Sequence, residues 1–320
     1  MPVLCTGFSF WGKYSIMNKG GIMLPFVRLF DYGNNVPPYA NNGGVRSPFT
    51  TTPVPSARNN FGYTYDAEKN TAYIFGGIQN TVTTDNQLWS FNLTTRTWLQ
   101  LANAPVSTFG SALCAYQGKI YLFGGSGNSS NNFYVYNIST NTWILNTNSI
   151  GKPSQLAYSK MINAGDKLYL WGSPSNNSLY SYTPSTNTWS SLGTSDGTNN
   201  TGGGDMCTDG TYIYITGQGV STAQKYHIES GVWSNIASVG GPNPSKIIYN
   251  RYDKHIYAVS FGALNLLRYD TEEDIWIALA VNTTLSNSTG ALFGSNNSAE
   301  IFYVLGFDNG TRVNTQYVFK

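Results

Sequence analysis

The stretch IYLFGG, Ile120–Gly125, is the clearest copy of a pattern that recurs along the chain. A short apolar segment ends in two glycines and is followed by a polar loop, an alternating aromatic segment and Trp143. Similar stretches start 43 to 48 residues apart, at Ala72, Ile120, Leu168, Ile213, Ile256 and Phe302. A repeat of this length over most of a 320-residue chain predicts an array of similar structural units.

The second half of each unit repeats in the same phase. In five units a tryptophan follows a polar turn, with spacings of 43 to 46 residues: Trp98, Trp143, Trp189, Trp233 and Trp276. Apolar and polar residues alternate with a period of two, which predicts short strands. In the second unit we expect strands near Phe109–Tyr116, Lys119–Phe123 and Asn132–Asn137, and a fourth from Thr142. Four strands in about 45 residues is the size of one propeller blade.

The order of apolar strand, double glycine, tyrosine and tryptophan is similar to the kelch repeat. The matching residues in the first two units are Gly76, Gly77, Phe91 and Trp98, then Gly124, Gly125, Tyr136 and Trp143. Units three and four keep one glycine, and units five and six have lost the pair. The resemblance implies an all-β fold, a six-bladed β-propeller of four-stranded blades over residues 56–320. We interpret the glycine pairs and the five tryptophans as packing residues.

Residues 1–55 form an N-terminal extension in this interpretation. The sixth unit stops at Lys320 before its tryptophan, so its blade lacks an outermost strand. Kelch propellers commonly take that strand from the other end of the chain. Gly7–Ser15, which contains Trp11, is the first candidate, and Pro25–Tyr32 is the second. The rest of the extension is rich in Pro, Gly and Asn and predicts an extended arm or linker. We expect this arm to lie along its own propeller or to dock onto a neighbouring copy or another protein.

Composition limits the function. Charged residues make up 11% of the chain and the formal net charge is +2, so no basic surface for nucleic acid is expected. The longest apolar runs are far shorter than the roughly 20 residues of a membrane-spanning helix, and the N-terminus does not resemble a secretory signal. We therefore predict no nucleic-acid partner and no membrane insertion.

Residues for catalysis or metal binding are sparse. His227 and His255 are expected at different positions of their blades, so they would not converge on a metal ion. The acidic cluster at 272–274 is expected to be a solvated hairpin turn. Three widely spaced cysteines predict free thiols rather than disulfides: Cys5, Cys114 and Cys207. We predict no cofactor, no metal and no catalytic residues.

The loops between the second and third strands of the blades are the candidate binding surface. They carry amides, hydroxyls and glycine with almost no charge. The candidate ligand-binding residues are Asn80, Thr84, Asn128, Asn131, Asn176, Asn177 and Gln218.

Two classes of function agree with this reading. The first is a non-enzymatic structural or protein-interaction propeller within a larger assembly or homo-oligomer. Its preferred setting is a virus or phage virion, as a tail or capsid accessory, with the arm and the polar loops as docking surfaces. The second is a secreted or surface carbohydrate-binding protein, or a carbohydrate-directed enzyme. The second class requires carboxylates or aromatic residues that converge at the propeller axis.

Overall fold

The chain divides into two units, Met1–Val36 and Pro37–Lys320, and the described residues belong to the second. The structure is a computed structural model. It describes residues 46–49, 51–79, 83–127, 131–154, 156–173, 176–195, 204–217, 223–237, 244–260, 266–279, 289–308 and 311–319.

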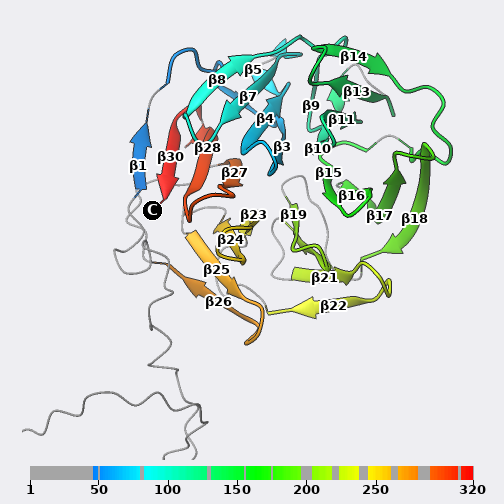
Figure 1. The fold of residues 1–320 in the computed structure, drawn as a ribbon, viewed down its shortest axis with the longest axis vertical. Coiled ribbons are helices and arrows are strands. Elements are labelled where there is room, and N and C mark those ends of the chain that lie inside the picture. The colour runs from blue at the N-terminus through cyan, green and yellow to red at the C-terminus, as the bar shows by residue number, and fades with distance from the viewer. Residues whose placement is uncertain are drawn as a thin grey trace, which may run out of the picture. The chain divides into compact units, whose positions relative to one another are not determined.

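Six antiparallel sheets surround a central axis and form a six-bladed propeller, as predicted (Figure 1). Blades 1 to 3 are continuous in sequence, and each contains four strands. Blade 1 contains β3 (Gly62–Asp66), β4 (Thr71–Phe75), β7 (Leu88–Asn92) and β8 (Thr97–Gln100); blade 2 contains β10 (Ala112–Tyr116), β11 (Lys119–Phe123), β13 (Phe133–Asn137) and β14 (Thr142–Leu145); blade 3 contains β15 (Lys160–Ala164), β16 (Lys167–Ser173), β17 (Asn176–Thr183) and β18 (Thr188–Thr194).

Blades 4 and 5 follow the same order, from an inner strand next to the axis to an outer strand. Blade 4 contains β19 (Asp205–Thr208), β20 (Tyr212–Thr216), β21 (Ala223–His227) and β22 (Trp233–Ile236); blade 5 contains β23 (Pro244–Asn250), β24 (His255–Ser260), β25 (Leu266–Asp270) and β26 (Ile275–Ala278). Inner strands are covered by the neighbouring blades, and outer strands face solvent. The burial patterns show this, because the inner strand β10 is buried at four of five positions whereas the outer strand β8 is exposed at three of four.

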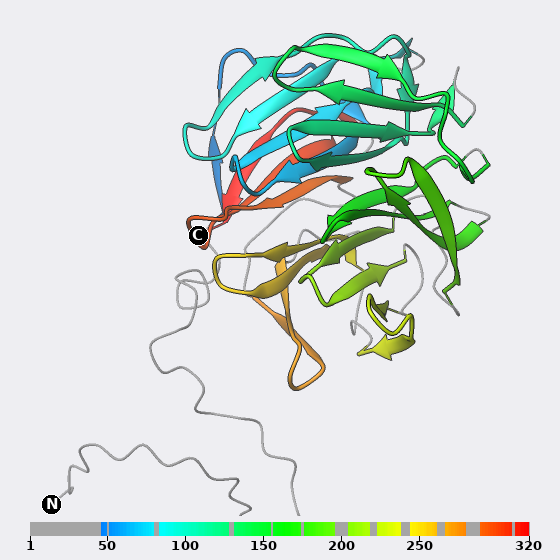
Figure 2. The same cartoon turned by 45° about the vertical axis from the view of Figure 1, so that its right-hand side comes forward.

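Blade 6 closes the ring with a strand from the N-terminal side of the chain. Its order is β27 (Thr289–Gly294), β28 (Ile301–Asp308), β30 (Gln316–Phe319) and then β1 (Arg46–Phe49), with the short β29 (Thr311–Arg312) beside β28. Figures 1 and 2 show β1 in blue next to β30 in red. The N-terminal origin of the closing strand was predicted, but neither candidate segment was right. Gly7–Ser15 and Pro25–Tyr32 lie outside the described residues, and Arg46–Phe49 occupies the position.

Aromatic residues join blade 6 to blade 1. The ring of Phe49 on the closing strand stacks on Phe91, with centroids 5.9 Å apart, and meets Phe302 edge-on at 6.0 Å. The indole of Trp98 donates a buried hydrogen bond of 2.8 Å to the amide oxygen of Gln316. Arg96 pairs with Glu300 at 3.0 Å. Ring closure thus uses both an apolar cluster and specific polar contacts.

The repeating tryptophans lie beside an aromatic ring of their own blade. In five blades the two centroids are 4.8 to 5.0 Å apart: Phe91–Trp98, Tyr136–Trp143, Tyr182–Trp189, Tyr226–Trp233 and Tyr269–Trp276. The residue two positions before each tryptophan has a positive φ between 53° and 71°: Arg96, Asn141, Asn187, Gly231 and Asp274. Asn, Asp and Gly tolerate this left-handed conformation best. The repeated turn is therefore a backbone requirement of the blade.

This turn also connects neighbouring blades. Asn141 Oδ1 accepts the Tyr136 hydroxyl at 2.6 Å and the backbone N–H of Ala102 at 2.8 Å, while the Trp143 indole donates to the Ala102 carbonyl at 2.9 Å. Asp274 makes the same contacts with Tyr269, at 2.6 Å, and with Ala237 N, at 2.7 Å. Within the predicted solvated turn at 272–274, Asp274 is therefore a structural residue.

The double glycine ends the second strand where the next blade begins. Gly124 and Gly125 have φ values of 65° and 101°, and Gly125 N donates to the carbonyl of Leu156 at 2.9 Å. A Cβ on Gly124 would lie 2.2 Å from that same oxygen. Gly76 and Gly77 repeat this arrangement against Thr108. Only glycine combines the backbone angle with so close an approach.

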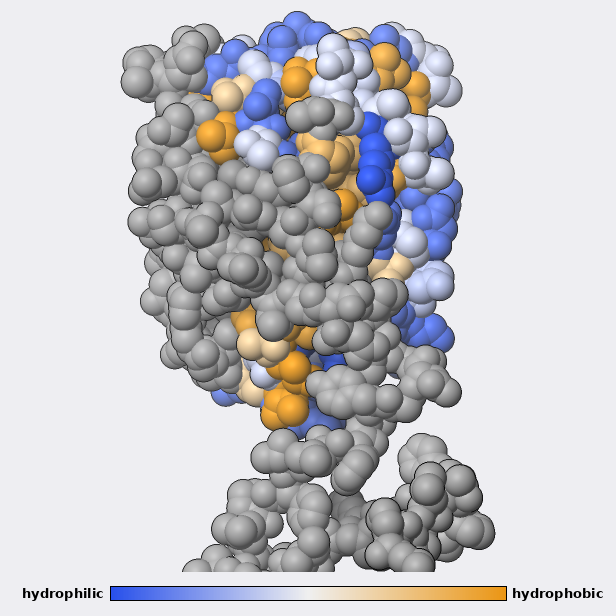
Figure 3. All heavy atoms as spheres, turned by 90° about the vertical axis from the view of Figure 1, so that its left-hand side faces the viewer, coloured by the Kyte–Doolittle hydropathy of each residue, from blue (hydrophilic) through white to orange (hydrophobic). Residues whose placement is uncertain are grey.

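Exposed large hydrophobic residues are spread over several blades. Most stand on outer strands or beside them: Leu99, Ile144, Leu145, Ile150, Val232, Tyr252 and Ile275. On the flank in Figure 3 the described hydrophobic residues form separate groups among hydrophilic ones. Scattered exposed hydrophobic residues are normal for a soluble surface, so they identify no docking site.

Candidate functional site

We use the name loop face for the end of the propeller that carries the connections between second and third strands. Short strands tie these loops to the segments that lead into each blade. β5 (Ile78–Gln79) pairs with β2 (Arg58–Asn59) and β6 (Thr83–Thr84), and β12 (Ser126–Gly127) pairs with β9 (Thr108–Phe109). The loops of blades 1 and 2 are thus held by backbone hydrogen bonds rather than by side chains alone.

Three predicted binding residues can be placed on this face. Thr84 is in β6, Asn131 donates to the carbonyl of Pro153 at 3.5 Å, and the carbonyl of Asn177 accepts from Ser195 N at 3.1 Å. Asn176 begins β17, and its side chain is not among those described. The other predicted residues lie outside the described residues: Asn80, Asn128 and Gln218. No two of the three placed side chains contact each other in the described hydrogen bonds.

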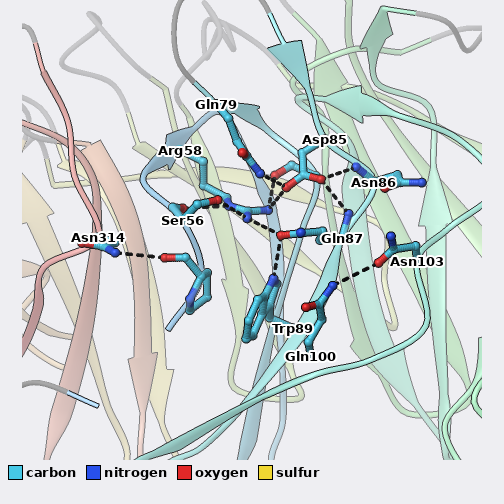
Figure 4. A network of polar contacts seen from close by, with 12 residues as sticks. Ser56, Arg58, Gln79, Asp85, Asn86, Gln87, Trp89, Gln100, Asn103 and Asn314 are labelled. Carbon is cyan, nitrogen blue, oxygen red and sulfur yellow. Dashed lines mark hydrogen bonds and ion pairs between the residues drawn. The ribbon is translucent and has the colours of Figure 1, made fainter. Parts of the chain in front are cut away.

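A buried charge network supports the blade 1 loop (Figure 4). Arg58, 2% exposed, forms an ion pair with Asp85 and donates to Gln87 Oε1 at 2.7 Å. It also donates to the carbonyl of Gly76 at 3.2 Å, which connects it to the double glycine. Asp85 Oδ1 accepts from the backbone of Asn86 at 2.7 Å. Burial lowers the pKa of Arg58, and the charge of Asp85 opposes that shift.

The network leaves the described loops of blades 1 and 2 without net charge. Arg58 and Asp85 are the charged residues of segments 56–61, 76–79, 83–87, 106–111 and 124–127, and they neutralise each other. Sequence reasoning missed this pair because the two residues are far apart in the chain. The sequence did contain one indication of the pair: Arg58 and Asp85 are the charged residues in two loops that otherwise carry no charge.

A second feature lies on the axis. A cavity of about 370 Å³ is lined by inner strands and by the turns that join first to second strands, at the end opposite the loop face. Its charged wall residues are Asp66, Glu68, Lys160, Asp205 and Arg251. Cys207 also lines it, and burial raises the pKa of this thiol well above its ordinary value. The thiol is therefore protonated and unreactive.

One position of the inner strand explains where the axial charges come from. In all six blades the residue at this position pairs with the equivalent residue of the second strand: Gly62, Ala112, Lys160, Asp205, Lys246 and Gly290. Blades 3, 4 and 5 place a charged residue there, whereas blades 6, 1 and 2 place Gly or Ala. Half of the ring is therefore charged, and the other half leaves room for a side chain that crosses the axis.

That side chain is Tyr63. Its hydroxyl donates to Asp205 Oδ2 at 2.6 Å, from blade 1 to the opposite blade 4, and Ile247 N donates to the same oxygen at 3.1 Å. The ammonium groups of Lys160 and Lys246 lie 4.7 and 5.8 Å from the centroid of the Tyr63 ring. We call Tyr63, Lys160, Asp205 and Lys246 the axial cluster.

Burial dominates the electrostatics of the axial cluster. It raises the pKa of Tyr63 well above its usual value, and the nearby charge of Asp205 adds to that effect. Burial also lowers the pKa of Lys160, against the attraction of Asp205. For Lys246, burial and then repulsion from Lys160 lower the pKa to about 7. The tyrosine hydroxyl is thus a hydrogen-bond donor, and burial disfavours the charged form of both lysines.

The remaining sequence-based candidates lie apart. His227, in blade 4, has its Nδ1 2.9 Å from the hydroxyl of Ser230, and His255, in blade 5, contacts Asp253. Among the described residues no group of three or more His, Cys, Asp or Glu side chains could hold a metal ion. Cys114 and Cys207 are buried free thiols, as predicted. The described part of the chain contains no helix long and apolar enough to cross a membrane.

Comparison with known proteins supports the propeller fold. The family model described as the KLHDC2/KLHL20/DRC7 Kelch-repeats domain matches residues 40–217 and 102–252. The chain is also similar to a solved structure titled "Structure of YjhT", with a TM-score of 0.68 and 16% sequence identity. That similarity covers 83% of this chain and 95% of the other, and at this identity it concerns the fold. The chain belongs to the kelch-repeat family of β-propellers.

Proposed function

We propose that this chain is a non-enzymatic protein-interaction propeller that docks a partner on its loop face. The observation that carries the proposal is the backbone pairing of the loops: β5 pairs with both β2 and β6, and β12 pairs with β9. Paired loops lose little conformational freedom when a partner binds, which favours affinity. The buried Arg58–Asp85 ion pair also connects β2 to the residue that follows β6.

The chemistry of the loop face favours a neutral polar partner surface. In the described loops of blades 1 and 2 the polar side chains are amides and hydroxyls, and the two charged residues, Arg58 and Asp85, are buried against each other. Such a surface can form hydrogen bonds with a partner and lets the partner's backbone approach closely, without a strong electrostatic field. These properties suit contacts between proteins within an assembly. We place the chain in a larger assembly, and a virion, such as a phage tail or capsid accessory, is the setting that its composition favours.

Two variants test the proposal. Thr84→Lys puts a charge on the loop face, and Thr95→Lys puts the same charge on the exposed turn between β7 and β8, at the opposite end of blade 1. We expect T84K to be lost from the native assembly and T95K to be retained, as measured by co-sedimentation with the assembled particle. Equal incorporation of both variants contradicts docking on this face.

The N-terminal arm is tested separately. Deletion of residues 1–45 leaves the closing strand Arg46–Phe49 in place, so the propeller can still close. If the arm contributes to docking, this variant unfolds at the same temperature as the full chain but does not enter the assembly. Normal incorporation would remove the arm from the proposal and leave the loop face.

A carbohydrate-directed activity is the second candidate function, and one observation favours it: Asp205 lies in the axial cavity with Asp66 and Glu68. Glycoside hydrolysis usually needs two carboxylates that flank the bond. Asp205 is 2% exposed and already accepts hydrogen bonds from Tyr63 and Ile247. Sugar release from oligosaccharides that Asp205→Asn abolishes would support this function, and unchanged release would refute a role for Asp205.

A further inference from the structure

We propose that the axial cavity binds a small molecule with an oxyanion, a carboxylate or a phosphate, and that Lys160 receives this group. The site is separate from the loop face and does not depend on partner docking. It rests on the placement of Lys160, on the cavity that this residue lines, and on the contacts that occupy its neighbours.

Lys160 supplies a cation without an ionic partner. Among the described residues its ammonium has no ion pair or hydrogen bond, and its contact is with the face of the Tyr63 ring, 4.7 Å from the centroid. An ammonium has three N–H donors, and a ring face does not accept all of them. The same side chain lines the 370 Å³ cavity. Its donors are therefore available to a ligand there.

The neighbouring carboxylate, Asp205, already accepts hydrogen bonds from other groups. Asp205 accepts the Tyr63 hydroxyl and the backbone N–H of Ile247 through the same oxygen, Oδ2. No ion pair joins Asp205 to Lys160 in the described structure. Burial lowers the pKa of Lys160 even though Asp205 attracts its proton, so the carboxylate compensates only part of the desolvation. An oxyanion in the cavity would supply the missing acceptor.

The walls of the cavity suggest the rest of the ligand. Tyr63, Tyr65, Tyr249 and Phe293 contribute aromatic surface, and Arg251 adds a second cation on the side of the turns. A cavity of 370 Å³ is within the usual size range of small-molecule sites, about 300–1,000 Å³. An organic anion with a compact body fits this combination better than a free inorganic ion, which would leave the aromatic walls uncovered.

Three probes with one ring test the proposal by isothermal titration calorimetry of the full chain. Benzoate carries a carboxylate, phenyl phosphate carries a phosphate, and benzyl alcohol carries no charge. We expect at least one of the two anions to bind and benzyl alcohol not to bind at the same concentration. The preferred anion identifies the headgroup. Binding of benzyl alcohol as tight as that of the anions would overturn the proposal, as would binding of none of the three.

Three variants locate the site. Lys160→Met should weaken anion binding about tenfold or more, the ratio expected for loss of one charge-assisted hydrogen bond. Lys225→Met is the matched control, because Lys225 also lies over a tyrosine ring, 4.9 Å from the centroid of Tyr212, but it is not part of the cavity wall. Asp205→Asn keeps an acceptor for Tyr63 and removes the negative charge, so it should tighten binding.

K160M and D205N are expected to change the affinity in opposite directions, so general misfolding cannot produce the expected result. Loss of binding in K160M together with a gain in D205N and no change in K225M supports the site. Equal affinities in K160M and K225M overturn it, because the anion would then bind elsewhere. Weaker binding in D205N also overturns it, since Asp205 would then contact the ligand favourably. Thermal unfolding of each variant shows whether the propeller remains folded.

Discussion

Substitution of the second-strand glycine in blade 2 tests how the repeat builds the propeller. Gly124→Ala places a Cβ 2.2 Å from the carbonyl oxygen of Leu156, at a φ of 65°. Gly118→Ala, in the turn between β10 and β11 of the same blade, has a φ of 72° and no atom within 4 Å of the added Cβ. The two variants share the backbone strain, and only the first has the steric conflict.

The expected costs follow from these contacts. A left-handed alanine costs roughly 1–2 kcal/mol, which applies to both variants. In Gly124→Ala the crowding adds about 1–3 kcal/mol, and loss of the Gly125 to Leu156 hydrogen bond adds about 1 kcal/mol. We therefore expect a total of about 3–6 kcal/mol for G124A and about 1–2 kcal/mol for G118A.

Urea unfolding followed by tryptophan fluorescence measures the difference. The Trp143 ring, which packs on Tyr136 in blade 2, reports on the affected blade. The midpoint should fall at least about twice as far for G124A as for G118A, provided that the slopes are equal. Equal shifts would mean that the double glycine is needed for its backbone angle alone and that its approach to the next blade is unimportant.

Three further predictions concern charged groups. Burial opposes ionisation of Asp274, but hydrogen bonds from Tyr269 and Ala237 outweigh this effect and lower the pKa of the carboxyl group. The ionised carboxylate therefore stabilises the folded chain above the unfolded-state pKa, and this stabilisation is lost as the pH falls through the folded-state pKa. Asp274→Asn, which copies Asn141 of blade 2, should reduce the loss of thermal stability between about pH 5 and pH 2. Burial lowers the pKa of Lys246 in the folded chain to about 7, below its usual value of 10.5. The unfolded chain therefore binds more protons between these two values, and stability should rise from about pH 7 to pH 9. Lys246→Met should remove most of that rise, and an unchanged slope would contradict the assignment. Arg58→Met leaves the Asp85 carboxylate buried without its cation and should cost about 3–5 kcal/mol in urea unfolding, whereas adding Asp85→Asn should recover much of it.

The blades could be predicted from sequence because each one repeats the same local requirements. The in-phase tryptophans, the positive-φ residue before them and the apolar second strands all depend on contacts inside one blade or with the next. The double glycine was recognised as a packing feature, and its contact with the next blade gives the reason. These signals are local, so a single sequence contains them.

The closing strand and the axial cluster could not be found in this way. The strand Arg46–Phe49 has no tryptophan and contains Pro48, which an outermost strand tolerates because one of its edges is unpaired. Its aromatic residue, Phe49, packs across the junction between blades 6 and 1 instead. The axial residues occupy equivalent positions, but the turns between first and second strands differ in length. Lys160 and Lys246 therefore do not align by a fixed spacing from the second-strand motif.

The proposed docking of a partner on the loop face requires that the native protein be part of a larger species. The most direct measurement is the mass of the native species that contains the chain, determined by light scattering on material isolated without denaturation, for the wild type and for T84K. We expect the wild-type species to be heavier than one chain and the T84K variant to be found as single chains. A wild-type species with the mass of one chain, or an assembly unaffected by T84K, would contradict the proposed docking.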